Sequence, residues 1–111
     1  MTQLNNKDRA VPDDMTLTDL IGLIESGIPF TLLDVREPHE WQSGHLEGAQ
    51  LLPLGQVIGN PDALSTLSKT LPLVVYCQHG IRSLRAVHHL REQGFDAFNL
   101  LVDWSSLDKG E

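Results

Sequence analysis

Hydrophobic and polar residues change their spacing several times along the chain, and each change marks the border of a predicted element. Thr16 and Asp19 fit a capping box, so a helix is predicted to begin after Thr16 and to stop at Gly27. Nearly unbroken apolar runs of strand length follow at residues 30–35 and 73–76. Such runs are typical of strands that are covered on both faces, as in a parallel sheet.

Weaker patterns predict the remaining elements. Pro38 favours a short helix that ends at Gly44, and Asn60-Pro61 is a typical helix start. We also expect a strand at residues 49–52, a helix at residues 83–93 ended by Gly94, and a last strand at residues 97–101. Strands therefore alternate with helices, which predicts an α/β fold with a central, mainly parallel sheet, flanking helices and right-handed crossovers.

Length and charge narrow the class of protein. The 111 residues suffice for one domain, which we place at residues 14–111, and we expect the polar residues 1–13 to form a flexible leader. A formal charge of −7 argues against nucleic acid or an anionic membrane surface as a partner. No apolar run reaches the roughly 18 residues of a transmembrane helix, and the chain opens without the apolar core of a secretory signal. These features favour a cytoplasmic domain.

The sequence contains one cysteine, Cys77. A single thiol excludes an internal disulfide, a CxxC redox pair and a zinc site built on several thiolates, and we expect no metal site. Cys77 ends the strand predicted at residues 73–76, and a short loop containing Gly80 leads to Arg82 at the start of a helix. In open α/β sheets, ligands bind at this end of the strands.

This strand, loop and helix have the chemistry of an anion site. Backbone N–H groups of the loop and of the first helical turn form a cradle for an anion. The same groups, together with Arg82, lower the pKa of a nearby thiol, so Cys77 is a candidate nucleophile for an anionic substrate. A lone cysteine at a strand end is otherwise a small buried hydrophobe. The remaining loop positions are candidate substrate-binding residues: Gln78, His79, Gly80, Ile81 and Ser83.

Three stretches resemble the motifs of rhodanese-like sulfurtransferases, in the same order. Residues 77–83 (CQHGIRS) resemble the active-site loop C-x-x-G-x-R. Residues 33–41 (LDVREPHEW) resemble the DVRxxxEW motif, and residues 44–49 (GHLEGA), followed by Pro53, resemble GHIPGA…P. The resemblance implies a rhodanese-like three-layer sandwich with a central, mainly parallel sheet.

The resemblance also implies a reaction. Cys77 would take a sulfane sulfur from a small anionic donor such as thiosulfate, become a persulfide, and pass the sulfur to cyanide, a thiol or a sulfur-carrier protein. Arg82 is expected to bind the anionic end of the donor and to keep Cys77 ionised. No metal or organic cofactor is implied. The chain departs from the family at its end, where paired glycines before a tryptophan are replaced by the shorter Leu101-Val102-Asp103-Trp104.

Three polar residues outside the loop are interpreted as structural support. Asp34 lies at the end of a buried strand, where a charge must be paired or hydrogen-bonded, so Asp34 and Arg36 are expected to join loops. His45 lies in a turn between Gly44 and Gly48, where a hydrogen-bonding role is favoured over acid–base catalysis.

Two alternative functions use the same loop. One is a phosphatase or arsenate reductase with a related Cys-Arg loop, and the other is a non-catalytic sulfur-carrier or regulatory module. Four residues separate Cys77 from Arg82, whereas the related phosphatases resemble C-x5-R. A shorter ring of N–H groups accommodates an added sulfur atom better than the three oxygens of a phosphate, because donors act only near the developing charge. The loop length therefore favours the sulfurtransferase.

Overall fold

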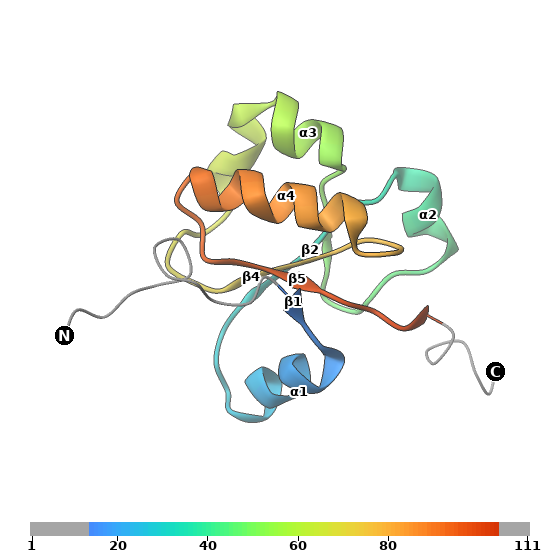
Figure 1. The fold of residues 1–111 in the computed structure, drawn as a ribbon, viewed down its shortest axis with the longest axis vertical. Helices are drawn as coiled ribbons and strands as arrows, with labels where there is room; N and C mark the ends of the chain where they lie inside the picture. The colour runs from blue at the N-terminus through green and yellow to red at the C-terminus, as the bar shows by residue number, and fades with distance from the viewer. Residues whose placement is uncertain (1–13, 105–111) are drawn as a thin grey trace.

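A five-stranded parallel sheet forms the centre of the computed structural model, which describes residues 14–104 (Figure 1). The strand order is β1-β5-β4-β2-β3, and every neighbouring pair is parallel. The α/β fold with a parallel sheet, expected from the sequence, is confirmed. The strands are β1 (Asp14–Met15), β2 (Thr31–Asp34), β3 (Gln50–Leu51), β4 (Leu73–Tyr76) and β5 (Ala97–Leu100).

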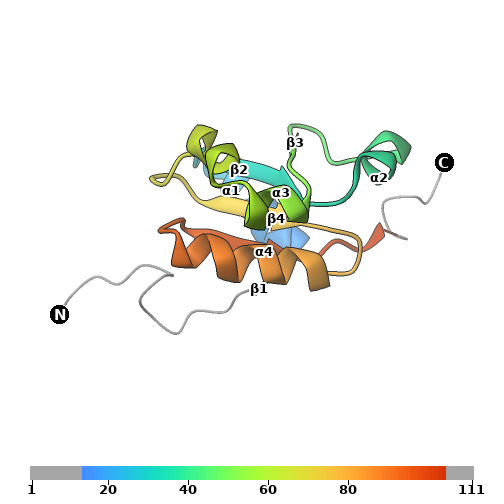
Figure 2. The same cartoon turned by 90° about the horizontal axis from the view of Figure 1, so that it is seen from above.

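Helices cover both faces of the sheet. The helix α1 lies on one face, while α3 and α4 lie together on the other (Figures 1 and 2). The short helix α2 follows β2 and lies near the carboxyl ends of the strands. The helices are α1 (Leu17–Glu25), α2 (Pro38–Ser43), α3 (Leu54–Gly59), the 3-10 helix η1 (Pro61–Thr66) and α4 (Ile81–Glu92).

Alternate side chains of the central strands build two separate cores. Leu33 and Val75 point to the face of α3 and α4, where they join a cluster that includes Leu90. Leu32 and Val74 point to the face of α1 and pack in a second cluster. All four side chains are buried, so both faces of β2 and β4 are apolar, which explains the unbroken apolar runs in the sequence.

Several predicted boundaries differ from the structure. The predicted capping box of Thr16 and Asp19 is present and opens α1. Two elements were missed: β1, which is only two residues long, and α3, whose two glycines lower helix propensity. The helix expected at Asn60-Pro61 is the 3-10 helix η1, and α4 begins at Ile81, before the expected residue 83. The leader proposed for residues 1–13 lies outside the described residues.

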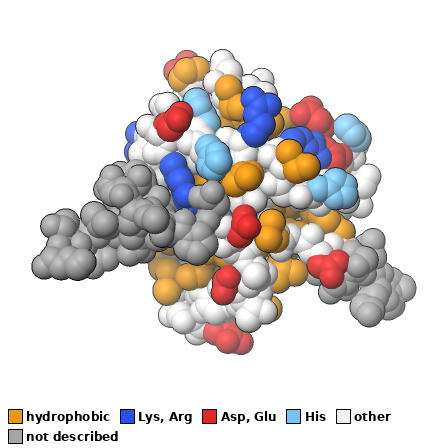
Figure 3. Space-filling model, in the orientation of Figure 1, with side chains coloured by type: hydrophobic (Ala, Val, Ile, Leu, Met, Phe, Trp, Pro, Cys, Tyr) orange, Lys and Arg blue, Asp and Glu red, His pale blue; other side chains and the backbone are white. Residues whose placement is uncertain are grey.

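The surface carries charges of both signs. Figure 3 shows acidic, basic and histidine side chains interspersed over one face, with no continuous basic area on it. Within residues 14–104, no helix is long and apolar enough to cross a membrane.

Candidate active site

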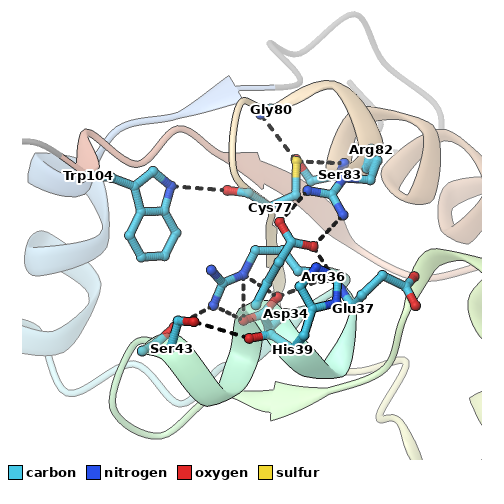
Figure 4. Close-up of polar contacts among 12 residues, drawn as sticks. Asp34, Arg36, Glu37, His39, Ser43, Cys77, Gly80, Arg82, Ser83 and Trp104 are labelled. Carbon is cyan, nitrogen blue, oxygen red and sulfur yellow. Dashed lines mark hydrogen bonds and ion pairs between the residues drawn. The ribbon is translucent and has the colours of Figure 1, made fainter.

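The candidate site lies at the carboxyl ends of the central strands. Cys77 follows β4, the middle strand of the sheet, and the Asp34–Arg36 segment ends β2 beside it. The loop after Cys77 reaches α4 through Gly80, which has a left-handed backbone conformation with φ of +84°. Because Gly80 has no Cβ, the chain makes this turn without the strain that other residues would meet there. The expected strand, cysteine, loop and helix are thus present (Figure 4).

The sulfur of Cys77 is buried and surrounded by hydrogen-bond donors. The N–H groups of Gly80 and Ser83 donate to Sγ over 3.2 and 3.3 Å, and Ser83 Oγ lies 3.2 Å from it. Burial alone would raise the pKa of the thiol, but hydrogen bonds from Ser83 and from the backbone of His79 and Gly80 outweigh it and lower the pKa below its ordinary value. The loop is therefore suited to hold a thiolate.

Asn99 extends this network away from the sulfur. Its side chain is buried on β5, where its Oδ1 accepts a hydrogen bond from the Ser83 hydroxyl. Its Nδ2 donates to the carbonyl of Gly80 and to the carboxylate of Asp14. Nothing in the sequence marked Asn99 as a functional residue, because only the pairing of β4 with β5 brings it next to the loop.

Arg82 forms an ion pair that the sequence did not indicate. Its guanidinium donates to both carboxylate oxygens of Glu40 on α2, over 2.7 and 2.8 Å. This pairing, more than any other interaction, lowers the pKa of Glu40 to about 2 and raises the pKa of Arg82. The charge of Cys77 also contributes to the raised pKa of Arg82.

Asp34 and Arg36 form a second, fully buried ion pair. The Arg36 guanidinium donates twice to Oδ2 of Asp34 and also to the carbonyl of Gly44, which fixes the turn after α2. Burial opposes the charge of Arg36, but the hydrogen bonds and charge of Asp34 outweigh it and raise the pKa of Arg36. The guanidinium also lies 4.7 Å from the ring centroid of Trp104. The pair thus joins the loop after β2 to the end of the described chain.

His45 lies outside the immediate surroundings of the sulfur. Its Nδ1 is 3.0 Å from the carbonyl oxygen of Trp41, and its ring stacks on the Trp41 ring with centroids 3.4 Å apart. These contacts are local to α2 and the turn that follows it.

The remaining loop residues divide into exposed and buried positions. His79 and Ile81 are exposed, Gln78 is half-buried, and Ile81 is 72% accessible despite its apolar side chain. Ser83, also predicted to bind substrate, is fully buried next to the sulfur. Its hydroxyl therefore contacts the thiol and Asn99.

The segment after β5 closes one side of the site. The indole N–H of Trp104 donates to the carbonyl of Cys77 over 3.4 Å. Leu101 packs against the loop, with its Cδ2 only 3.1 Å from where a Cβ on Gly80 would lie. The short segment without paired glycines therefore still places a tryptophan beside the cysteine. In the described part of the chain, no group of three or more His, Cys, Asp or Glu side chains is arranged to hold a metal ion.

Comparison with known families identifies this arrangement. The sequence model of the rhodanese-like domain family matches residues 16–107, which is most of the chain. The chain belongs to the rhodanese-like domain family. Both the cysteine loop after β4 and the Asp34–Arg36 segment after β2 lie within the matched part of this rhodanese-like domain.

Relatives of this rhodanese-like domain include proteins named as sulfurtransferases. The probable adenylyltransferase/sulfurtransferase MoeZ of Mycobacterium tuberculosis is 36% identical over 95 residues, which cover 82% of this chain but 24% of MoeZ. The chain thus spans about a quarter of that relative's length. The thiosulfate sulfurtransferase GlpE of Shewanella oneidensis is 39% identical over 82 residues, covering 71% of this chain and 69% of GlpE.

Solved structures share the fold of this rhodanese-like domain. The human single-domain sulfurtransferase TSTD1 superimposes with a TM-score of 0.72 at 27% identity, covering 91% of this chain and all of TSTD1. A rhodanese-like domain protein from Staphylococcus aureus gives a TM-score of 0.75 at 27% identity, over 88% of this chain and 94% of that protein. The predicted rhodanese-like architecture is confirmed.

Proposed function

We propose that this chain is a sulfurtransferase of the thiosulfate type, which moves a sulfane sulfur through a persulfide on Cys77. The observation that carries the proposal is the Cys77 sulfur at the carboxyl end of β4, where the N–H groups of Gly80 and Ser83 donate to it. A sulfur held in this way is an activated nucleophile. The relatives named as sulfurtransferases support the same chemistry.

In the first step, the Cys77 thiolate attacks the outer sulfur of a donor such as thiosulfate. A new bond forms between Sγ and the outer sulfur, while the bond between the two sulfur atoms of thiosulfate breaks. Sulfite leaves with the electron pair of the broken bond, and the enzyme holds a persulfide. Backbone N–H groups around the loop stabilise the negative charge that remains on the added sulfur.

In the second step, an acceptor takes the outer sulfur. Cyanide or a thiolate forms a bond to that sulfur, the persulfide bond breaks, and its electron pair returns to Sγ as the Cys77 thiolate. With cyanide the product is thiocyanate, and with a thiolate it is a new persulfide. Because Cys77 is the only cysteine in the sequence, an external acceptor must take the sulfur.

Arg82 is proposed to bind the anionic end of the donor. A guanidinium has five N–H donors, and Glu40 occupies one on each of two nitrogens. The ion pair fixes Arg82 in place before a donor arrives, which lowers the entropic cost of binding. A small anionic donor would therefore bind to Arg82, whose guanidinium is already oriented by Glu40 on α2.

The acceptor is proposed to be a thiol or a sulfur-carrier protein. His79 and Ile81 are exposed beside the buried sulfur and are available to contact such an acceptor. A single cysteine and no disulfide suit a reducing compartment such as the cytoplasm.

Intact-mass analysis after exposure to thiosulfate tests this function. We expect one added sulfur atom, its loss on addition of cyanide, and an equal amount of thiocyanate. Cys77→Ser is the matched control, because it changes one atom of the side chain and should prevent the addition while keeping the fold. Absence of the added sulfur, together with hydrolysis of aryl phosphates, would favour the phosphatase alternative; absence of both would favour a non-catalytic module.

A further inference from the structure

The orientation of the Asn99 amide is fixed by its neighbours. Its Nδ2 lies 3.2 Å from the carbonyl oxygen of Gly80 and 3.3 Å from a carboxylate oxygen of Asp14. Both oxygens accept hydrogen bonds, so the amide nitrogen must face them. The amide oxygen Oδ1 then faces Ser83, with which it forms a hydrogen bond.

This orientation determines what the Ser83 hydroxyl does. An amide oxygen accepts but does not donate, so the single hydroxyl hydrogen of Ser83 points to Asn99. The same hydroxyl oxygen lies 3.2 Å from Sγ of Cys77. While its hydrogen is given to Asn99, Ser83 can offer the sulfur only a lone pair. A lone pair accepts the S–H of a thiol, whereas a thiolate requires a donor.

We propose that Asn99 is a positioning residue that competes with Cys77 for the hydroxyl hydrogen of Ser83. In the resting thiol, Ser83 donates to Asn99 and accepts the S–H of Cys77. When the thiol loses its proton to solvent, the Ser83 hydroxyl turns and donates to the thiolate, and its bond to Asn99 breaks. Ser83 keeps its own proton throughout. The proposal rests on the proposed function only in taking Cys77 as the nucleophile.

The competition has a chemical consequence. Forming the thiolate gains one hydrogen bond from Ser83 but costs the bond between Ser83 and Asn99. Removing the Asn99 oxygen abolishes that cost, so the thiolate should form more readily without it. Asn99 therefore restrains the reactivity of the resting thiol, while the N–H groups of Gly80 and Ser83 continue to support the charged form.

Other charges near the sulfur must be held constant in a test. These groups are Arg82 on α4, His79 in the loop, Glu40 on α2, which pairs with Arg82, and Asp14 on β1, which contacts Asn99. Histidine titrates in the same pH range as an activated thiol. All variants would therefore carry His79→Gln, which removes the imidazole.

The experiment measures the rate of Cys77 alkylation by iodoacetamide against pH, which reports the thiol pKa without any sulfur transfer. Asn99→Leu removes the amide oxygen at similar volume, and Asn99→Ala repeats the test with a smaller side chain. We expect both to lower the thiol pKa and to raise alkylation below that pKa by about two- to tenfold, because the cost removed is that of one hydrogen bond between neutral groups. Ser83→Ala should raise the pKa.

The double variant Ser83→Ala with Asn99→Leu separates competition from a structural role. Without the Ser83 hydroxyl, Asn99 cannot compete with Cys77 for its hydrogen. The thiol pKa of the double variant should therefore equal that of Ser83→Ala alone. An unchanged or raised pKa in both Asn99 variants would overturn the proposal. So would a fall of equal size in the Ser83→Ala background, which would show that Asn99 acts through the loop backbone. Because the readout is alkylation, these outcomes are independent of whether thiosulfate adds sulfur to Cys77.

Discussion

Arg82 and Glu40 lie 42 positions apart in the sequence and meet as a two-bond ion pair, with N–O distances of 2.7 and 2.8 Å. The pair joins the first turn of α4, the helix that follows the cysteine loop, to the short helix α2. Its geometry matches the planar fork of a guanidinium to the two oxygens of a carboxylate. The cation next to Cys77 is therefore held by a helix that follows a different strand.

The first prediction concerns donor binding by Arg82. Arg82→Ala should weaken the use of thiosulfate by roughly ten- to a hundredfold in kcat/KM, because a hydrogen bond to a charged group contributes about 1.5–3 kcal/mol. Arg82→Lys should restore only part of this activity, since an ammonium keeps the charge without the planar fork. Thiosulfate:cyanide kinetics measure both effects.

Arg85→Ala is the matched control for this prediction, because Arg85 is exposed on the same helix. It should leave the kinetics close to wild type. Unchanged thiosulfate kinetics in Arg82→Ala would show that Arg82 has only a structural role with Glu40.

The second prediction concerns the pH dependence of stability. The pKa of Glu40 falls from 4.5 to about 2 through its bonds to Arg82, so the folded state favours its charged form. This contribution is fully present above pH 4.5 and is lost as the pH falls toward 2. Because the Arg82 side chain is 35% exposed, the expected size is about 0.2–1 kcal/mol.

Urea unfolding of wild type and Glu40→Gln at pH 6, 4 and 2.5 would measure it. The difference in free energy of unfolding should shrink as the pH falls. In an Arg82→Met background, the same substitution should give a difference that depends much less on pH, because only the Glu37 N–H and the charge of Arg36 still lower the pKa of Glu40. A constant difference in the wild-type background would contradict the ion pair.

The third prediction concerns the buried pair of Asp34 and Arg36. Arg36→Met leaves the carboxylate of Asp34 buried without its cation, and breaking such a pair typically costs about 3–5 kcal/mol. Adding Asp34→Asn should recover part of the loss, because no buried charge then remains and the amide oxygen still accepts the N–H of residue 36. Chemical denaturation measures all three proteins. A double variant no more stable than Arg36→Met would argue that lost packing on Trp104 dominates.

The fourth prediction concerns the turn at Gly80. Gly80→Ala should cost about 1–2 kcal/mol, because φ of +84° is unfavourable for a residue with a Cβ. Adding Leu101→Ala should restore little of this stability. The Cδ2 of Leu101 is the flexible end of a half-exposed side chain and can move away from the new Cβ, so most of the cost comes from the backbone conformation. Gly22→Ala is the control: it lies within α1 with open space around it and should instead gain about 0.5–1 kcal/mol. Equal stability of Gly80→Ala and wild type would mean that this turn tolerates a side chain.

The sequence predicted those features that depend on neighbouring residues. The capping box at Thr16, the apolar runs of β2 and β4 and the loop from Cys77 to Arg82 are all local patterns, and they are present where expected. The two-residue β1 was missed because Asp14 and Met15 are too few to show a period. It exists because Leu101 N–H bonds to Met15 beyond the end of β5.

The partners of the site residues could not be predicted, because they come from distant parts of the chain. Glu40 lies four positions after Arg36, within the motif at residues 33–41. Only the packing of α2 beside α4 makes it the partner of Arg82. Asn99 reads as one polar residue within an otherwise apolar strand. Its place beside Ser83 follows from the register of β4 and β5, in which Val75 lies opposite Asn99.

The two outer strands, β1 and β3, are each two residues long, half the length of the three strands between them. An edge strand presents unpaired N–H and C=O groups that can pair with a strand of another molecule. Among the described residues 14–104, each outer strand offers too few such groups to template this pairing. The brevity of β1 and β3 thus protects the sheet from joining edge to edge into aggregates, and substitutions that lengthen either strand would remove that protection.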